Sequence, residues 1–349
     1  MNQTSEAVAT ATATAFINLP FRISITSVSL LATIFNVTAI IVVFNSYFGS
    51  KFTNFILKAQ PIIDLTASLS AAIFYIVQST PYPNEQTGVY IIDLLICHFW
   101  FRNASFWFPC ILSVQNLVCI SIDRFTSVVF PIVYKTNSNR LFVFYFLYLT
   151  TMLLILYPPT PLFRRYTEYQ CVMDYSFPWM QDKIFLDFAV YSWVVFAYTL
   201  PVLVMIISHV WVIHSIRRSQ SHRHTSVSLS SDGCVQIRKK VKQLVVTTAI
   251  MSSQQAALHF FECLQQILVT TGVMSYTYGN PIEQTSTLLL LFSCLLNPCI
   301  LVLTTATLRR RLSISVKRIT DKVSVSSGRV GMTSGPISSG QLTTVDCDR

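Results

Sequence analysis

Charged residues are scarce in this chain. Asp, Glu, Lys and Arg make up 11% of the 349 residues, whereas a soluble domain carries about 25%. Hydrophobic residues make up 52%, and the mean hydropathy is +0.53. We therefore expect a polytopic membrane protein whose main solvent is the lipid bilayer. Glycine is also scarce, with nine residues, which argues against a fibrous or low-complexity chain.

A basic segment is missing from the start of the chain. Residues 1–15 are rich in Ala and Thr and contain no Lys or Arg, whereas a cleavable signal peptide begins with a basic region. We expect the first apolar helix to act as its own insertion signal. Asn2 begins an Asn-Gln-Thr sequon in the predicted outer segment and is a candidate glycosylation site.

Positive charge is plentiful but confined to particular segments. The net charge is +10, and most of the 25 Lys and Arg residues lie in four segments that alternate with apolar spans, namely 51–58, 124–140, 217–242 and 309–349. This alternation is typical of cytoplasmic loops of a membrane protein. It argues against a nucleic-acid partner, which would need a continuous basic groove.

Seven apolar stretches are long enough to cross a bilayer, which takes about 20 residues each. An odd number of crossings puts the basic tail inside and the N-terminus outside, at the plasma membrane. We predict an all-α membrane protein, a seven-helix bundle with a short amphipathic eighth helix. Its parts are the outer segment 1–21, the bundle 22–307, the eighth helix 308–320 and a disordered tail 321–349. The predicted spans are 22–46, 53–79, 97–130, 141–161, 184–215, 239–271 and 283–307.

The stretch 113–135 contains an adjacent acid and base, Asp123 and Arg124, at the end of an apolar run. An arginine there is costly unless it reaches water or a partner, and Asp123 can hold it. The stretch resembles the third helix of rhodopsin-like G-protein-coupled receptors, whose Asp/Glu-Arg-aromatic triplet ends that helix. The sequence around Arg124 is most similar to that of nematode serpentine chemoreceptors of the gamma or class V groups. An arginine that only anchors the helix end is the alternative.

The resemblance implies roles for polar residues inside the spans. Asn36 in helix 1 and Asp64 in helix 2 would meet beside Asn297-Pro298 of helix 7, and Asp64 would hold a sodium ion or a water network. Protonated Asp64 bonded to its neighbours is the alternative. No other cofactor and no metal site is expected, since the His-x-His at 222–224 has no partner at finger spacing.

The same family carries a disulfide between the outer end of helix 3 and the following outer loop. Of the nine cysteines, Cys97 and Cys171 fall at predicted outer positions, where disulfides persist. This pair is the expected bridge, although Cys97 lies about two residues further from Arg124 than is usual in the family.

The departures from the family pattern concern its activation machinery. Leu301 and His209 stand where the family has tyrosines, and residues 239–280 contain neither a Trp-x-Pro motif nor any proline. The cytoplasmic end of helix 6 offers no acid to Arg124, so we expect Asp123 alone to restrain it. The residues expected to couple to a heterotrimeric G protein are Asp123, Arg124, His209, Asn297 and Pro298.

The absence of certain charged residues also narrows the range of ligand classes. Residues 283–307 contain no Lys for a retinal Schiff base, and the neighbourhood of Phe106 lacks the acid of amine receptors. An aromatic pocket with few polar anchors suits a small apolar or weakly polar ligand, although each aromatic could instead face lipid. For Arg102 we expect a position at the outer interface, with a ligand carboxylate as the alternative. The pocket candidates are Arg102, Asn103, Phe106, Trp107, His259 and Glu262.

The rival functions are less well supported. A neuropeptide receptor of the same fold would favour a strongly acidic outer surface, and the outer loops are mixed in charge. A transporter would show paired, interrupted spans in two related halves. An enzyme would need a cluster of catalytic groups at membrane depth, and Asp64 and Glu262 are isolated in sequence. We expect a receptor for a small-molecule or peptide ligand, not an enzyme.

Overall fold

The chain was analysed as a computed structural model. It describes residues 19–77, 87–100, 103–156, 164–167, 170–173, 183–221, 232–275, 279–306, 308–314 and 317. Asn2, Arg102 and the predicted tail 321–349 lie outside these residues, so the predictions made for them stay predictions.

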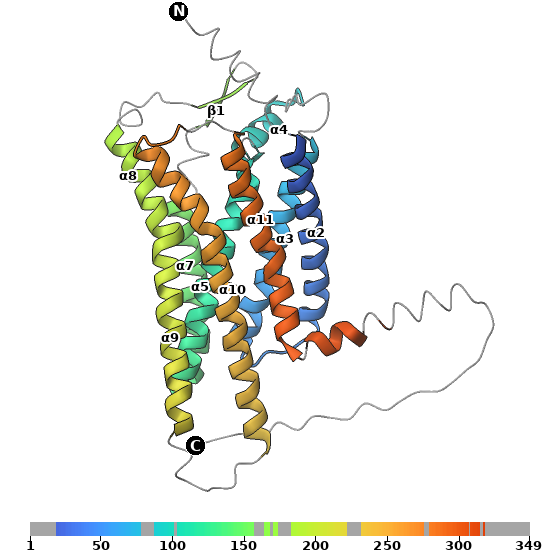
Figure 1. The fold of residues 1–349 in the computed structure, drawn as a ribbon, viewed down its shortest axis with the longest axis vertical. Coiled ribbons are helices and arrows are strands. Elements are labelled where there is room, and N and C mark those ends of the chain that lie inside the picture. The colour runs from blue at the N-terminus through green and yellow to red at the C-terminus, as the bar shows by residue number, and fades with distance from the viewer. Residues whose placement is uncertain are drawn as a thin grey trace, which may run out of the picture.

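Seven long helical stretches run up and down side by side (Figure 1), which confirms the predicted bundle. Six of them are long and apolar enough to cross a membrane, and α10 is the seventh. The stretches are α2 (Leu19–Phe44), α3 (Lys51–Val77), α5 (Ala104–Val129), α7 (Ser138–Leu156), α8 (Lys183–Val194) continued by η5 (Val195–Thr199) and α9 (Leu200–Ser221), α10 (Asp232–Thr270), and α11 (Pro281–Thr304). A short helix, α6 (Pro131–Thr136), joins α5 to α7.

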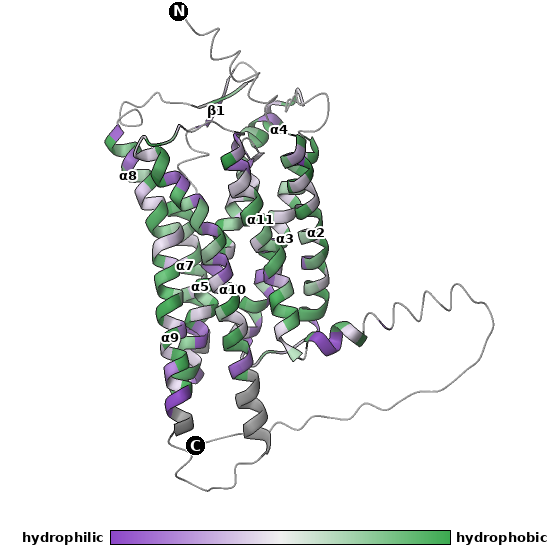
Figure 2. Cartoon of the chain, viewed as in Figure 1, coloured by the Kyte–Doolittle hydropathy of each residue, from purple (hydrophilic) through white to green (hydrophobic). Residues whose placement is uncertain are grey.

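Helix α5 forms the centre of the bundle. Of its most apolar window 67% is buried, against 11% for α7, which lies at the periphery. The helices are mainly apolar (Figure 2), and many of their large apolar side chains are exposed on the outside of the bundle. This suits contact with lipid, because a polar group that faced lipid would lack a hydrogen-bond partner. Polar side chains inside the bundle must therefore find their partners on neighbouring helices.

The third span differs from the prediction of one continuous helix beginning at Cys97. Helical structure begins earlier, with α4 (Tyr90–Leu95) and the π-helix η2 (Ile96–Trp100). The chain then breaks at Asn103, whose φ of 59° is left-handed, before α5 starts. Asparagine tolerates this conformation better than most residues. The predicted third span is therefore not one continuous helix, because α5 starts anew after Asn103.

A two-stranded antiparallel hairpin covers the same end of the bundle, and the sequence did not predict it. Strand β1 (Arg164–Thr167) pairs with β2 (Gln170–Met173). The predicted disulfide is confirmed: Cys97 in η2 is bonded to Cys171 in β2, with Cα atoms 5.4 Å apart. We call this end of the bundle the disulfide end, and the opposite end, where Arg124 lies, the arginine end.

A further helix follows α11 and turns away from the bundle axis (Figure 1). Residues 308–314 are helical, with Leu308 buried in the core and Leu312 packed against it, while Arg309, Arg310 and Arg311 are exposed. One apolar face and one basic face define an amphipathic helix. The start of the predicted eighth helix is therefore confirmed, and most of 315–320 lies outside the described residues.

Candidate functional site

Asp123 and Arg124 form an ion pair at the arginine end, and it is the one ion pair within the described residues. Both side chains are buried, with exposed fractions of 1% and 4% for the residues. Asp123 also accepts hydrogen bonds from Thr53 Oγ1 (3.0 Å) and from the Tyr134 hydroxyl (2.6 Å). A buried charge is tolerable only when paired and hydrogen-bonded in this way. The predicted pairing of Asp123 with Arg124 is thus observed.

The expectation that Asp123 alone restrains Arg124 is wrong. The Arg124 Nη2 group also donates to Thr53 Oγ1 at 2.5 Å, so the N-terminal turn of α3 holds the guanidinium as well. Ser50 extends this arrangement, because its hydroxyl lies 2.5 Å from that of Tyr134 and 3.0 Å from that of Thr53. We call Ser50, Thr53, Asp123, Arg124 and Tyr134 the arginine cluster.

Tyr134 lies on α6, outside the spans, and acts as a donor to Asp123. Burial, and next the negative charge of Asp123, raise the pKa of the Tyr134 hydroxyl above its ordinary value. The hydroxyl therefore keeps its proton and its hydrogen bond to Asp123 throughout the physiological range. The loop after α5 is in this way tied to the ion pair.

His209 connects three helices close to the arginine cluster. Its Nε2 atom lies 3.2 Å from Ser121 Oγ on α5 and 3.3 Å from Ser252 Oγ on α10. Ser121 precedes Arg124 by three residues, one helical turn. The other ring nitrogen, Nδ1, is buried without a hydrogen-bond partner among the described residues. Movement of α9 or α10 relative to α5 would therefore change the contacts of His209 with Ser121 and Ser252.

Asp64 is the centre of a second buried network. Its carboxylate accepts hydrogen bonds from Ser113 Oγ (2.6 Å), Asn297 Nδ2 (3.0 Å) and Gln60 Nε2 (3.1 Å). Gln60 in turn accepts from Asn116 Nδ2 at 2.8 Å. Asp64 and Asn297, predicted to meet, are therefore in direct contact.

Asn36 joins this region through the backbone and not through Asp64. Pro298 has no N–H group, so the carbonyl of Cys294, four residues earlier in α11, loses its helical partner. Asn36 Nδ2 donates to that carbonyl at 3.0 Å. The asparagine of α2 therefore repairs the hydrogen bond that the proline of α11 removes.

The arrangement around Asp64 offers little to a sodium ion. A cation needs oxygen ligands, but Gln60 and Asn297 present amide N–H groups to the carboxylate. Their amide oxygens are occupied, because Gln60 Oε1 accepts from Asn116 and Asn297 Oδ1 accepts from Gln254 at 2.6 Å. Of the three described side chains that donate to the Asp64 carboxylate, Ser113 alone does so through an oxygen. The residues thus fit a carboxylate held by neutral donors better than a cation site.

A chain of hydrogen bonds leads from Asp64 along α10 towards the disulfide end. Gln254 Nε2 donates to Asn297 Oδ1 and, at 3.2 Å, to Ser293 Oγ. Ser293 donates to Gln255 Oε1, and Gln255 Nε2 lies 2.5 Å from His259 Nε2. This polar path lies on α10, the helix in which the sequence lacks the Trp-x-Pro motif, and it connects Asp64 in the core to His259 near the disulfide end.

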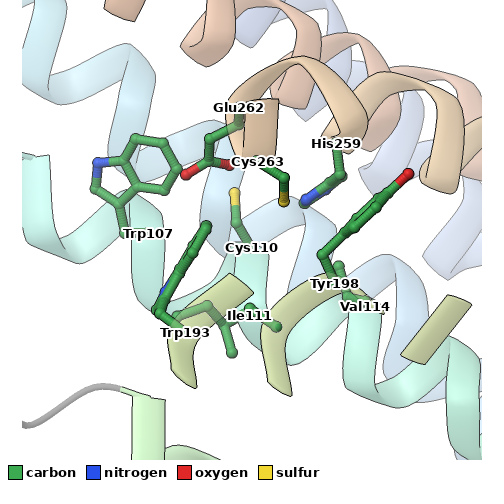
Figure 3. A pocket seen from close by; sticks show the side chains of 10 residues that line it. Trp107, Cys110, Ile111, Val114, Trp193, Tyr198, His259, Glu262 and Cys263 are labelled. Atoms are coloured by element: carbon green, nitrogen blue, oxygen red, sulfur yellow. The ribbon is translucent and has the colours of Figure 1, made fainter. Parts of the chain in front are cut away.

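A pocket lies at the disulfide end of α5, α8–η5 and α10 (Figure 3). It encloses about 290 Å³ of space between atoms, counted with its opening. A second cavity, of about 270 Å³, lies beside it, and Trp107 lines both. The first is lined by Trp107, Cys110, Ile111, Val114, Trp193, Ala197, Tyr198, His259, Glu262 and Cys263; the second by Tyr75, Asn103, Trp107, Gly279, Glu283, Gln284 and Thr287.

Of the residues predicted to line the ligand pocket, four of the five described ones line one of the two cavities and one does not. Trp107, His259 and Glu262 line the first cavity, and Asn103 lines the second. Phe106 lines neither: it is fully buried in a core cluster that includes Phe74. Its place one residue before Trp107 turns it to another face of α5.

Several residues of the site were missed. Gln60, Ser113, Gln254 and Gln255 are neutral polar residues inside otherwise apolar spans, and this contrast was the available signal. Thr53 and Tyr134 carried no comparable signal, because hydroxyl groups are common near helix ends and loops.

Seven membrane helices, a buried acid–arginine pair at one end and an aromatic pocket at the other define a multi-pass membrane protein of the seven-helix receptor class. The model of the family described as 7 transmembrane receptor (rhodopsin family) matches residues 35–301. This match covers more than half of the chain, so the chain belongs to the rhodopsin family of seven-transmembrane receptors. A search among curated proteins found no match.

Proposed function

We propose that this receptor binds a small ligand at the disulfide end and activates a heterotrimeric G protein at the arginine end. The observation that carries the proposal is the continuous hydrogen-bond chain from His259 in the pocket to Asp64 in the core. A ligand that changes the position of His259 changes the contacts between α10 and α11. The bundle then shifts between two packings, of which the ligand prefers one.

Release of Arg124 is the proposed output of that shift. In the present packing its guanidinium is held by Asp123 and Thr53 and is shielded from a partner. His209 bridges α5, α9 and α10 one turn away, so separation of these helices breaks its contacts with Ser121 and Ser252. The freed Arg124 and the basic segment 217–242 would then meet the G protein.

The dimensions of the pocket support a small ligand rather than a peptide. In the present packing each of the two cavities beside Trp107 leaves free room of only about 10 Å³, about that of one water molecule. The helices must therefore separate before a ligand enters, and a small molecule needs a smaller opening than a peptide. A chemosensory role at the plasma membrane, with the disulfide end outside, agrees with this size and with the resemblance to nematode chemoreceptors. A neuropeptide would have to make most of its contacts above these cavities.

The test is basal nucleotide exchange. Purified receptor in nanodiscs is mixed with heterotrimers from the main Gα classes, and GTPγS binding is measured for the wild type and for Asp123→Asn. Loss of the charged partner should raise basal exchange on at least one heterotrimer by about fivefold or more, since couplings of this kind are about 1–3 kcal/mol.

Thr53→Val serves as the graded control, because it removes the hydrogen bonds of the Thr53 hydroxyl to Asp123 and Arg124 but keeps both charged partners of the ion pair. We expect a smaller rise for it than for Asp123→Asn, at equal amounts of folded receptor. Exchange that stays at the receptor-free level for both variants, on every heterotrimer, would refute G-protein coupling.

A further inference from the structure

We infer that the pocket at the disulfide end selects a cationic ligand, such as a small amine, and that Glu262 is its counter-ion. This inference rests on the proposed site and assigns the chemistry of its ligand. It departs from the apolar ligand expected from the sequence. The acid that amine receptors carry on the third span is supplied here by α10.

Glu262 is the first reason. Its residue is 3% exposed, and its side chain lines the first cavity (Figure 3). It makes no hydrogen bond or ion pair with any described residue. An isolated carboxylate in such a place is costly unless a partner neutralises it. A cation that enters the cavity would supply that partner and hold Glu262 in its charged form.

The aromatic walls are the second reason. Trp107 lies beside the Glu262 carboxylate with Trp193 below it, and Tyr198 lies beside His259 (Figure 3); all three rings line the first cavity. The Tyr198 hydroxyl is directed away to the carbonyl of Ala256, at 3.1 Å, so the walls present ring surfaces. Ring faces attract cations, most strongly for Trp.

His259 adds no competing positive charge. Gln255 Oε1 accepts from Ser293, so the amide N–H₂ of Gln255 faces His259 Nε2. That nitrogen must then be an acceptor, and the ring is neutral with its proton on Nδ1. A neutral imidazole leaves the carboxylate as the dominant charge in the cavity.

A second acid makes an unpaired charge on Glu262 still more costly, because like charges repel. Glu283 lines the neighbouring cavity, and its charge acts on both Glu262 and Tyr75. Unlike Glu262, it has a structural partner, because its Oε2 accepts from the backbone N–H of Gly279 at 2.5 Å. Glu283 therefore caps α11, while Glu262 is available to the ligand.

Cys263 allows a test that does not require the natural ligand. It lines the same cavity and is a free thiol. Methanethiosulfonates transfer their RS group to a thiolate: a new S–S bond forms, the S–SO₂ bond breaks, and methanesulfinate leaves. The aminoethyl reagent is a cation and the sulfonatoethyl reagent an anion of similar size. Full-length receptor in nanodiscs is treated with each, and modification of Cys263 is followed by peptide mass spectrometry.

The ratio of the two rates, each divided by the rate with free 2-mercaptoethanol, is the readout. A cavity of one charge sign raises the local concentration of counter-ions by about tenfold or more, so we expect a ratio above about 10 for the wild type. In Glu262→Gln the ratio should fall towards one. A neighbouring charge alters the intrinsic reactivity of the thiol equally for both reagents, so the ratio cancels that effect.

Asp187→Asn is the matched control, because it removes an acid of α8 that does not line either cavity; its ratio should equal that of the wild type. Glu262→Gln should melt at or above the temperature of the wild type, since it removes an unpaired buried charge. A ratio near one in the wild type, an unchanged ratio in Glu262→Gln, or no modification of Cys263 would overturn the inference. The assay contains no G protein, so its failure would leave the coupling proposal standing, and the reverse also holds.

Discussion

Asp93 shows how much one side chain can organise at the disulfide end. Its carboxylate accepts from the backbone N–H of Thr87 (2.6 Å), from the Thr87 hydroxyl (2.8 Å) and from the backbone N–H of Gly88 (3.2 Å). It also accepts from the Tyr166 hydroxyl of β1 at 3.0 Å. One acid thus fixes the start of α4 and joins it to the hairpin that carries half of the disulfide.

These contacts predict a pH dependence of stability. The hydrogen bond from the Thr87 backbone, the largest of several causes, lowers the pKa of Asp93 below its usual 3.8. A lowered pKa means that the charged form stabilises the fold above about pH 4, and that this contribution is lost as the pH falls through the folded-state pKa. The melting temperature of the wild type should therefore fall more steeply below pH 4 than that of Asp93→Asn.

The variant should also melt below the wild type at pH 7, because a neutral amide replaces the acceptor of four hydrogen bonds. Asp187→Asn, made in the same way, is the control at pH 7 and should melt with the wild type there. Parallel melting curves for Asp93→Asn and the wild type between pH 7 and 3 would contradict the role assigned to Asp93.

At the residue scale, sequence reasoning found the charged members of the site and the neutral ones that match the family pattern, but it missed the other hydroxyl and amide side chains. Asp64, Asp123 and Arg124 were identifiable because a charge within an apolar span is costly and needs a reason. Thr53 was not, since one hydroxyl near a helix start has many uses. Its role depends on α3 and α5 approaching closely at the arginine end, which only the packed bundle reveals.

At the scale of elements, prolines create gaps in the backbone hydrogen bonding that other helices fill. Pro201 follows the π-helix η5, and Gln115 of α5 donates to the carbonyl of Phe196 at 3.1 Å. Pro298 leaves the carbonyl of Cys294 to Asn36. In lipid no water can replace these partners, so for each of these two prolines a side-chain amide on a neighbouring helix donates to the carbonyl that the proline leaves without its helical partner.

This pairing predicts a coupling between Asn36 and Pro298. Asn36→Ala should lower the free energy of unfolding by about 1–3 kcal/mol, the cost of a buried carbonyl without a partner. In a Pro298→Ala background the backbone N–H of residue 298 restores the helical bond, so the same substitution should cost less. Thermal denaturation of the four proteins in detergent measures the coupling, expected at about 1 kcal/mol.

Thr38→Ala is the control, because Thr38 is half-buried on α2 and donates within its own helix. It should show no coupling to Pro298→Ala. Equal costs of Asn36→Ala with and without the proline would show that Asn36 acts elsewhere.

Helix boundaries were predictable where hydropathy changes sharply along the chain. They were not predictable where the backbone conformation of a single residue ends the helix. The spans were placed within a few residues for α2, α3 and α11. The break at Asn103 was missed because a left-handed backbone conformation at one asparagine leaves no trace in hydropathy. The β1–β2 hairpin was missed because four-residue strands are too short for an alternating pattern.

At the scale of the whole molecule, orientation is the property most open to direct measurement. The count of spans and the basic segments predict that the disulfide end faces the exterior. An epitope tag before Met1 should be reached by antibody on intact cells, and a tag after Arg349 only after permeabilisation. Staining of the C-terminal tag on intact cells would reverse the assignment and place Arg124 on the wrong side for a G protein.

The polarity of α10 has a consequence for how the receptor is made. Within the 18-residue windows that define the other six spans, α10 is not apolar enough to qualify, because Gln254, Gln255, His259 and Glu262 lie along it. A segment of this kind gains little free energy by entering lipid alone. We expect the translocon to retain α10 during synthesis until α11 emerges and supplies Ser293 and Asn297, so that the last two spans leave the channel as a pair.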